Sequence, residues 1–181
     1  MDANIIFTRV TPEYEHLEEL FYIRDEAFPE NERSTTRNID ALSENSKLVI
    51  YGIEDDNQLI GFTYLIYLDD DFVYLLYLAI GQQFRDKHYG SLVLRTLIDD
   101  LLKDKVLFGC IEALIPETPN YEQRVKRAQF YTRNDMHILD EIIHKDLIGD
   151  YQLVCSDKNV SADTLKQKLM SMQPSGVYQH E

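Results

Sequence analysis

The segment formed by residues 72–102 constrains the fold of this chain more than any other. It begins with a run of aromatic and aliphatic residues, 72–80, that has the length and composition of a buried β-strand. Apolar residues then recur with helical spacing and predict an amphipathic helix over 88–103, whose buried face contains Leu94, Leu97, Ile98 and Leu101. The fold must therefore include a strand that turns directly into a helix.

The turn between this strand and this helix predicts an anion site. A basic cluster, Arg85, Lys87 and His88, precedes Gly90 and Ser91. The first amide groups of a helix have no intrahelical partner, and the helix dipole favours negative charge there, so the expected ligand is a phosphate or pyrophosphate. The alternative is an ordinary turn whose cationic residues face water, because this glycine content matches neither the P-loop nor the dinucleotide fingerprint.

The composition fits one folded domain and narrows the range of partners. With 181 residues, of which 44% are hydrophobic, the chain can bury a sizeable core. We expect a single domain over residues 1–156, followed by a tail, 157–181, with a short helix near 161–172. The net charge of −14, from 32 acidic and 18 basic residues, argues against nucleic acid and anionic membrane as partners. It suits a cationic small-molecule substrate.

The cysteines and the lack of a long apolar run predict a reduced, cytoplasmic protein. Cys110 and Cys155 lie in apolar strand-like runs, where cysteine is usually a small buried residue rather than half of a disulfide. No apolar run approaches the roughly 20 residues that span a bilayer, and the first residues lack the layout of a secretory signal. Since no grouping of His, Cys, Asp and Glu has metal-ligand spacing, we expect no metal.

The remaining patterns predict short strands and helices in one sheet-based domain. The turn-forming segments 55–57 and 69–71 are too short for anything but antiparallel hairpins, and Ser34 or Thr35 can cap a short second helix. The order of the expected strands and helices along the chain favours an α+β or mixed α/β fold with helices on both faces of the sheet. The expected strands are 4–10, 47–54, 58–68, 72–80, 106–115, 136–144 and 150–156, and the main helices are 13–27, 88–103 and 121–133.

Two motifs within this element order carry a resemblance to a known family. Residues 85–90 align with the pyrophosphate motif Q/R-x-x-G-x-G/A, with His88 at the position of the first glycine. Residues 130–136 align with an F-Y-x-x-N-G-F run at a helix end, with Asp135 in place of the glycine. Over residues 4–156 the chain resembles the GNAT family of acyl-CoA-dependent N-acetyltransferases. The resemblance implies a mixed, mostly antiparallel central sheet of about seven strands flanked by helices on both faces.

The resemblance also implies the co-substrate, acetyl-CoA, and the residues that bind it. In the family the acetyl group passes to a primary amine by direct attack in a ternary complex, without a metal. The backbone of Leu78, Ala79 and Ile80 would bind the pantetheine arm of coenzyme A. Tyr131 would contact the cofactor and act as the general acid toward its thiolate, because a phenol is mostly protonated at neutral pH. The pyrophosphate would lie on Arg85, Asp86, Lys87, His88, Tyr89, Gly90 and Ser91.

The sequence leaves the general base open. Glu112 lies in the strand after the expected CoA helix, and Glu30 and Glu32 lie in the loop that borders the acceptor site in the family. A surface carboxylate is the alternative interpretation for each of them, as a packed helix-end aromatic is for Tyr131. Cys110 as an acyl-carrying nucleophile would imply a ping-pong route, but no residue next to it in sequence activates the thiol.

The partner expected from these patterns is a cationic small-molecule or peptide amine, and a homodimer is a further option. A function of a different class is a non-catalytic module that binds or senses acyl-CoA, because His88 and Asp135 stand at glycine positions of the family. An enzyme that uses nicotinamide or nucleoside triphosphate is disfavoured, since both glycine fingerprints are missing.

Overall fold

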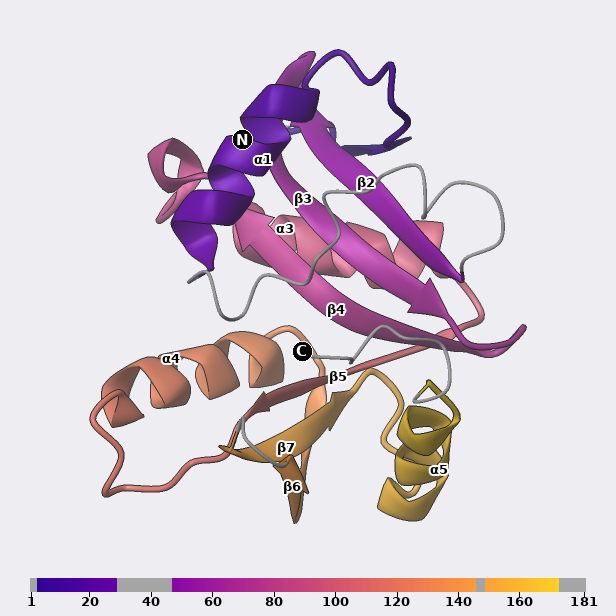
Figure 1. The fold of residues 1–181 in the computed structure, drawn as a ribbon, viewed down its shortest axis with the longest axis vertical. Helices are drawn as coiled ribbons and strands as arrows, with labels where there is room; N and C mark the ends of the chain where they lie inside the picture. Colours follow the sequence, from indigo (N-terminus) through magenta and orange to yellow (C-terminus); the bar gives the residue numbers. More distant parts are fainter. Residues whose placement is uncertain (1–2, 29–46, 146–148, 173–181) are drawn as a thin grey trace.

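A seven-stranded β-sheet organises the computed structural model, which describes residues 3–28, 47–145 and 149–172 (Figure 1). The strand order is β1-β2-β3-β4-β5-β7-β6. Every neighbouring pair is antiparallel except β4 and β5, which are parallel. The strands are β1 (Ile6–Arg9), β2 (Leu48–Asp55), β3 (Gln58–Tyr67), β4 (Phe72–Ile80), β5 (Val106–Glu112), β6 (His137–Lys145) and β7 (Gly149–Cys155).

Helices cover both faces of this sheet. On one face, Leu20 of α1 and Leu165 of α5 share a core cluster with Phe62 of β3. On the other face, Leu94 of α3 and Ala128 of α4 share a second cluster with residues of β3 to β5. In Figure 1, α1 lies in front of the sheet and α3 behind it. The helices are α1 (Leu17–Ala27), α3 (Tyr89–Thr96), α4 (Tyr121–Thr132) and α5 (Ala162–Met172), with a 3₁₀ turn, η2 (Gln82–Phe84), before α3 and a π-helical turn, η3 (Leu97–Leu101), after it.

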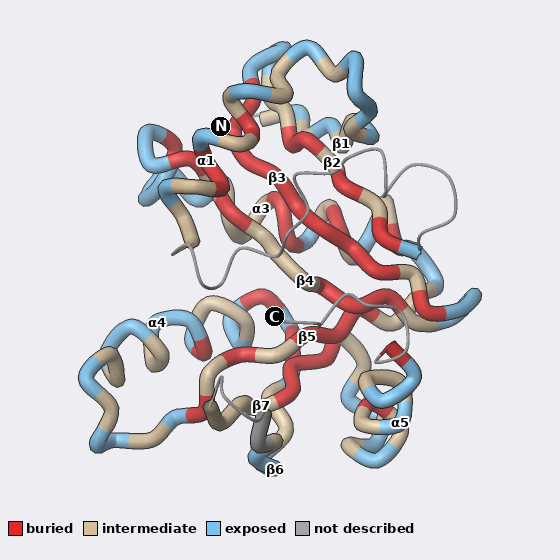
Figure 2. The backbone as a smooth tube through the Cα atoms, viewed as in Figure 1, coloured by how far each residue is buried: buried red, intermediate tan, exposed pale blue. Residues whose placement is uncertain are grey.

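Strand β3 is the centre of the core. Eight of its ten residues are buried, which means that both of its faces are covered. Figure 2 shows the buried residues running along β3 and along β5 and β7, between the helices of the two faces. A strand that is covered on both faces has a nearly continuous apolar sequence instead of alternating apolar and polar residues, and β3 has such a sequence.

The turn between β2 and β3 fixes the position of Asp55. Asp56 and Asn57 have φ angles of 49° and 60°, so both central residues adopt the left-handed conformation of a type I′ hairpin turn. Asp55, directly before the turn, accepts a hydrogen bond from the backbone N–H of Asn4 at 2.9 Å. Its second oxygen accepts one from the hydroxyl of Tyr89 at 2.7 Å. The hairpin is therefore connected to the start of α3.

The turn between β3 and β4 anchors the last described helix. The side chain of Asp69 accepts hydrogen bonds from the backbone N–H groups of Asp71 and Phe72, at 3.0 and 2.9 Å. Lys168 of α5 donates to the same carboxylate, and its ammonium group lies 4.5 Å from the centre of the Phe72 ring. The hydrogen bond from Lys168 lowers the pKa of Asp69. These contacts hold α5 against the hairpin turn.

The fold class expected from the sequence is confirmed, and the differences are local. The first helix begins at Leu17 rather than near residue 13, because residues 11–16 form turns in which the N–H of Tyr14 donates to the carbonyl of Thr11. The strand expected over 106–115 ends at Glu112. The expected helix after Ser34 or Thr35 lies outside the described residues.

Three observations on the described residues bear on location and metal binding. No helix there is long and apolar enough to cross a membrane. Both cysteines are free thiols: Cys155 is buried and Cys110 is half-buried. No group of three or more His, Cys, Asp or Glu side chains in these segments is arranged to hold a metal ion.

We predict opposite outcomes for two substitutions in the first hairpin turn. Asn57→Ala keeps a β-carbon at φ 60° but removes the short polar side chain that makes this left-handed conformation tolerable for asparagine. It should lower the free energy of unfolding by about 1 kcal/mol. Asn57→Gly keeps the left-handed conformation accessible and should change it by less than about 0.5 kcal/mol. Urea denaturation of both variants and the wild type measures this, and equal losses in the two variants would contradict the turn assignment.

Candidate active site

The sheet splits between β4 and β5. The parallel ladder starts at Phe72 and Val106 and ends at Leu75 and Gly109. Beyond that point β4 stays paired with β3, while β5 continues alongside β7. Figure 1 shows the ends of β4 and β5 pointing in diverging directions. The edge of β4 that faces β5 therefore has no strand partner, among the described residues, over 76–80.

A β-bulge explains why the split occurs at this position. Tyr77 pairs with Tyr64 of β3 but Leu75 pairs with Leu65, so Leu76 is an extra residue in β4. A bulge bends its strand and increases the local twist, which directs β4 away from β5. At the last shared rung the strands are very close, because a β-carbon on Gly109 would lie 3.2 Å from the carbonyl oxygen of Leu75.

The backbone segment expected to bind pantetheine lies on this unpaired edge. Leu78, Ala79 and Ile80 pair with β3 on one side only. The hydroxyl of Thr63 donates to the carbonyl oxygen of Tyr77 at 2.9 Å, which fixes β4 on that side. Backbone amide groups on the other edge are available to an extended ligand, as in complexes where a peptide adds to the edge of a sheet.

The turn after β4 is closed by its own side chains. The Nε of Arg85 donates to the carbonyl oxygen of Ile80 at 3.0 Å. Phe84 is buried, and its ring packs edge-on against the ring of Tyr89 at 5.9 Å between centres. Hydrogen bonding to Asp55 raises the pKa of Tyr89. The turn is thus held to the sheet at both of its ends.

The first amide groups of the helix that follows have no hydrogen-bond acceptor within the described segments, as the sequence predicted. His88 precedes α3 with φ 64°, and its side chain forms no capping hydrogen bond. Asp86 has φ 61°, so two residues of this turn are left-handed. The family has glycine at the position of His88, and left-handed geometry is what glycine adopts without strain. The chain therefore keeps the backbone shape of the motif at this position without its glycine, at a cost of about 1 kcal/mol.

The two sequence motifs meet in space through Gly90 and Phe130. A β-carbon added to Gly90 would lie 3.2 Å from Cε2 of Phe130, so the first turn of α3 lies directly against the end of α4. The guanidinium of Arg133 lies 5.5 Å from the centre of the Phe130 ring. Sequence reasoning did not assign a role to Phe130 or Arg133. The signal for both was their place in the motif around Tyr131.

Tyr131 lies on the side of α4 that contacts the two diverging strands. Its half-buried ring packs against the cluster that contains Leu75 of β4 and Ile111 of β5, and edge-on against Phe130 at 5.2 Å. Burial raises the pKa of the Tyr131 phenol, and the positive charge of Arg127 opposes this effect. Its hydroxyl forms no hydrogen bond with any described residue. The phenol is therefore protonated at neutral pH and available as a donor.

Glu112 connects the end of β5 to α4. Its Oε2 accepts a hydrogen bond from Arg127 at 2.6 Å, and its Oε1 accepts one from the side-chain amide of Asn120 at 2.9 Å. Arg124 lies 3.3 Å from Oε1 as a second ion-pair partner. Both carboxylate oxygens are therefore in use. The other candidate bases, Glu30 and Glu32, lie outside the described residues.

A groove of about 420 Å³ lies between α1 and the turn after β4. Its α1 side carries the carboxylates of Glu19 and Glu26. Its other side is formed by the turn after β4. The groove is lined by Glu19, Tyr22, Ile23, Glu26, Gly81, Gln82 and Gln83.

The split sheet, the basic turn before α3 and the helix carrying Tyr131 are features of one class of protein. The model of the acetyltransferase (GNAT) family matches residues 12–133, well over half of the chain. The chain therefore belongs to the GNAT acetyltransferase family, and the expectation from the motifs is confirmed. Comparison with curated proteins gives no match.

Solved structures of this family share the fold at low sequence identity. A GNAT-family protein from Bacteroides thetaiotaomicron is 19% identical, with a TM-score of 0.79 over 97% of this chain and 99% of its own. A GNAT-family acetyltransferase from Elizabethkingia anophelis with acetyl-CoA bound is 17% identical, with a TM-score of 0.56 over 87% and 99%. A spermidine N-acetyltransferase chimera that includes Vibrio cholerae sequence is 12% identical, with a TM-score of 0.62 over 83% and 93%.

We predict that Gly90 matters more than Lys87 for binding of coenzyme A. Gly90→Val introduces a side chain against Phe130 at the helix start and should weaken binding at least about 10-fold. Lys87→Ala removes one exposed, screened charge and should weaken it less than about 5-fold. Calorimetry with CoA gives both dissociation constants.

Gly90→Ala is the matched control, because its single β-carbon requires Phe130 to move by only a few tenths of an ångström. It should fall between the other two variants. Melting temperatures separate loss of binding from loss of fold. A greater effect of Lys87→Ala would mean that side chains, and not the helix start, bind the phosphate.

Proposed function

We propose that this protein transfers the acetyl group of acetyl-CoA to a primary amine by direct attack in a ternary complex. The observation that carries the proposal is the unpaired edge of β4, which runs from the bulge at Leu76 into the turn before α3. An extended ligand with amide groups at one end and phosphates at the other matches this edge and this helix start. The pantetheine and pyrophosphate of CoA have that chemistry.

In the proposed complex, the cofactor binds mainly through the backbone. The amide groups of Leu78, Ala79 and Ile80 on the open edge hold the pantetheine arm. The first N–H groups of α3, from Tyr89 to Ser91, hold the pyrophosphate, and the exposed Arg85 and Lys87 add screened charge. Arg133, whose guanidinium lies over the Phe130 ring, adds a further positive charge beside this helix start.

The proposed reaction uses Tyr131 as the general acid. The neutral amine attacks the thioester carbonyl, and the carbonyl π pair moves to its oxygen, which a backbone N–H near Leu78 polarises. The tetrahedral intermediate collapses, the C–S bond breaks, and the CoA thiolate takes the phenolic proton. The recipient is the CoA thiolate, whose conjugate thiol has an ordinary pKa near about 8.5, and burial keeps the Tyr131 phenol protonated until the C–S bond breaks.

The proton of the attacking amine leaves through a base or through water. A base role for Glu112 stays a prediction, and it requires Arg127 or Asn120 to release one carboxylate oxygen. The contacts of Glu112 support a positioning role instead, in which it fixes the start of α4 and so the placement of Tyr131. A base role for Glu32 stays a prediction as well.

The proposed acceptor is an amine that is cationic in solution. Glu19 and Glu26 line the groove beside the turn and favour the approach of a cation. The spermidine N-acetyltransferase of similar fold acts on such an amine. A second candidate function, an acyl-CoA sensor without turnover, is favoured by His88 and Asp135, which are left-handed residues at glycine positions.

We expect acetyl-CoA to raise the melting temperature, because a ligand that binds only the native state stabilises it. At a hundredfold excess over Kd the rise should be roughly 5–10 °C for a domain of this size. NAD and ATP serve as controls and should give no comparable rise. Thiol release with a panel of amines then separates turnover from sensing. No shift at millimolar CoA would overturn the cofactor assignment.

Tyr131→Phe should lower turnover by about 100-fold to 10,000-fold, because it keeps the ring but removes the proton. The affinity for CoA and the melting temperature should change little. The wild-type pH profile should fall above the ordinary tyrosine pKa of about 10, since burial raises the pKa of Tyr131, and this alkaline limb should disappear in the variant.

Tyr121→Phe, at the start of the same helix, is the matched control and should leave turnover unchanged. Arg127→Gln should move the alkaline limb to higher pH, because Arg127 lowers the pKa of Tyr131. If both limbs survive in Tyr131→Phe, then another group or water is the acid.

A further inference from the structure

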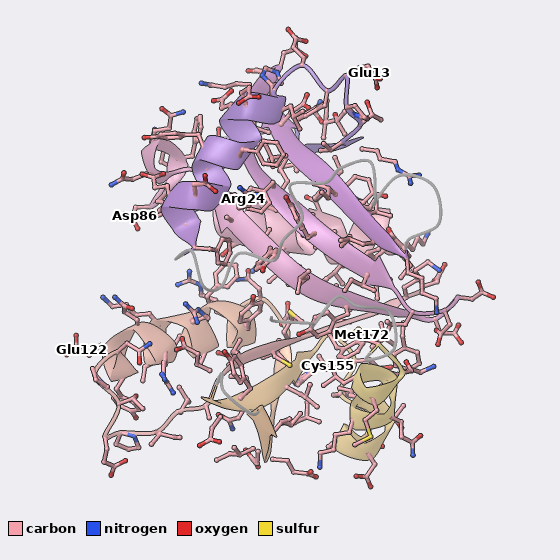
Figure 3. All side chains as sticks on the ribbon, in the orientation of Figure 1. Glu13, Arg24, Asp86, Glu122, Cys155 and Met172 are labelled. Carbon is pink, nitrogen blue, oxygen red and sulfur yellow. The ribbon has the colours of Figure 1, made fainter. Side chains whose placement is uncertain are left out.

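Arg24 is a buried charge that neither the fold nor the proposed chemistry uses. It belongs to the face of α1 that packs on the sheet, together with Leu20 and Ile23, and it is only 3% exposed. Its guanidinium lies 4.8 Å from the centre of the Phe21 ring. Figure 3 labels Arg24 beside the C-terminal half of α1, over the sheet. The neighbouring positions on this face carry aliphatic side chains.

The hydrogen bonds of Arg24 are incomplete. Its Nε and Nη2 both donate to a single oxygen, Oδ1 of Asp25, at 2.9 and 2.7 Å. Within the described segments its Nη1 is buried and has no acceptor. A guanidinium carries five N–H donors, so three of them remain, two on Nη1 and one on Nη2. One of the Nη1 donors and the remaining Nη2 donor form the end-on edge of the group.

A buried guanidinium with unsatisfied donors is costly, and loss of its proton does not relieve this cost. Arginine stays charged in proteins, and a buried donor without an acceptor costs about 1–3 kcal/mol, more when the group is charged. A leucine or methionine would fill this position without that cost. The end-on edge of a guanidinium matches the two oxygens of a carboxylate. The Nη1 of Arg24 therefore has unused capacity to donate to an anion or a strong acceptor.

The site lies close to the strand that borders the gap. The N–H of Phe28 donates to the carbonyl oxygen of Arg24, so the two residues are one helical turn apart on the same side of the chain. The Phe28 ring packs against the ring of Tyr77 at 4.8 Å. Tyr77 directly follows the bulge at Leu76. Arg24 is thus linked to β4 through Phe28 and Tyr77.

We propose that Arg24 binds a carboxylate of the acceptor, so that the acceptor is an amine that also carries a carboxylate, such as an amino acid or a peptide. The inference rests on the proposed function for the amine and deepens it. Asp25 balances the charge of Arg24 in the free protein and orients the guanidinium. The acidic groove attracts the ammonium end of the same ligand, and Arg24 selects its other end.

The test compares acceptors that differ only in this group. L-phenylalanine with phenethylamine, L-lysine with cadaverine, and glycylglycine with its C-terminal amide are three such pairs. For at least one pair the wild type should prefer the carboxylate by about 10-fold to 100-fold in kcat/KM, the range of a charged hydrogen bond. Arg24→Gln should reduce this ratio to near one. Arg95→Gln, at an exposed arginine of α3, is the matched control and should keep it.

A binding measurement keeps the inference separate from catalysis. N-acetylated glycine, phenylalanine and lysine should raise the melting temperature of the wild type and of Arg95→Gln, and the corresponding amides should not. Arg24→Gln should lose the rise. Arg24→Met should also lose the rise, because it keeps the packing on Phe21 but removes the guanidinium.

The inference is overturned if the wild type uses the acceptors with and without a carboxylate equally, or if its preference survives in Arg24→Gln. A buried water is then the partner of Nη1. If no amine is acetylated but the N-acetyl acids still stabilise the protein through Arg24, the proposed function fails and the carboxylate site stands.

Discussion

The parallel contact between β4 and β5 and its early end at Leu75 and Gly109 determine the rest of the site. While the two strands are paired, they form the core of an ordinary mixed sheet. The extra residue Leu76 then turns β4 away, and each strand keeps a different neighbour, β3 or β7. Because the bulge changes only one pairing, the sheet opens in its middle without losing the hydrogen bonds on its outer sides.

The helix α4 is fixed relative to both sides of this opening. At its start, Asn120, Arg124 and Arg127 hold Glu112 at the end of β5. At its end, Phe130 lies against Gly90 at the start of α3, which follows β4. The position of Tyr131 thus depends on contacts made to each of the diverging strands. Arg124 and Arg127 of this helix both pair with Glu112, so these two arginines order a carboxylate of the neighbouring strand.

The sequence was sufficient for the strands, the first two hairpins and the turn from β4 into a helix, because their signals are local. Acidic turn residues flank each hairpin, and the basic cluster before Gly90 precedes a clear helical pattern. The bulge at Leu76 has no such signal, since it lies inside an unbroken apolar run and its pairing with β3 decides it. The ion pairs of Glu112 and the contact of Phe130 with Gly90 join residues distant in sequence, so motif spacing could not supply them. The same holds for Arg24, whose burial results from packing on the sheet.

An open backbone edge is a recognition element that has no side chains of its own. Residues 76–80 need only stay extended and apolar enough to remain in the core, and any set of residues that does so presents the same row of amide and carbonyl groups. Under the proposed function, selection for cofactor binding acts on strand geometry and on the bulge far more than on residue identity along β4. On the same proposal, proteins that share this architecture can diverge widely in sequence while the edge of β4 keeps its shape.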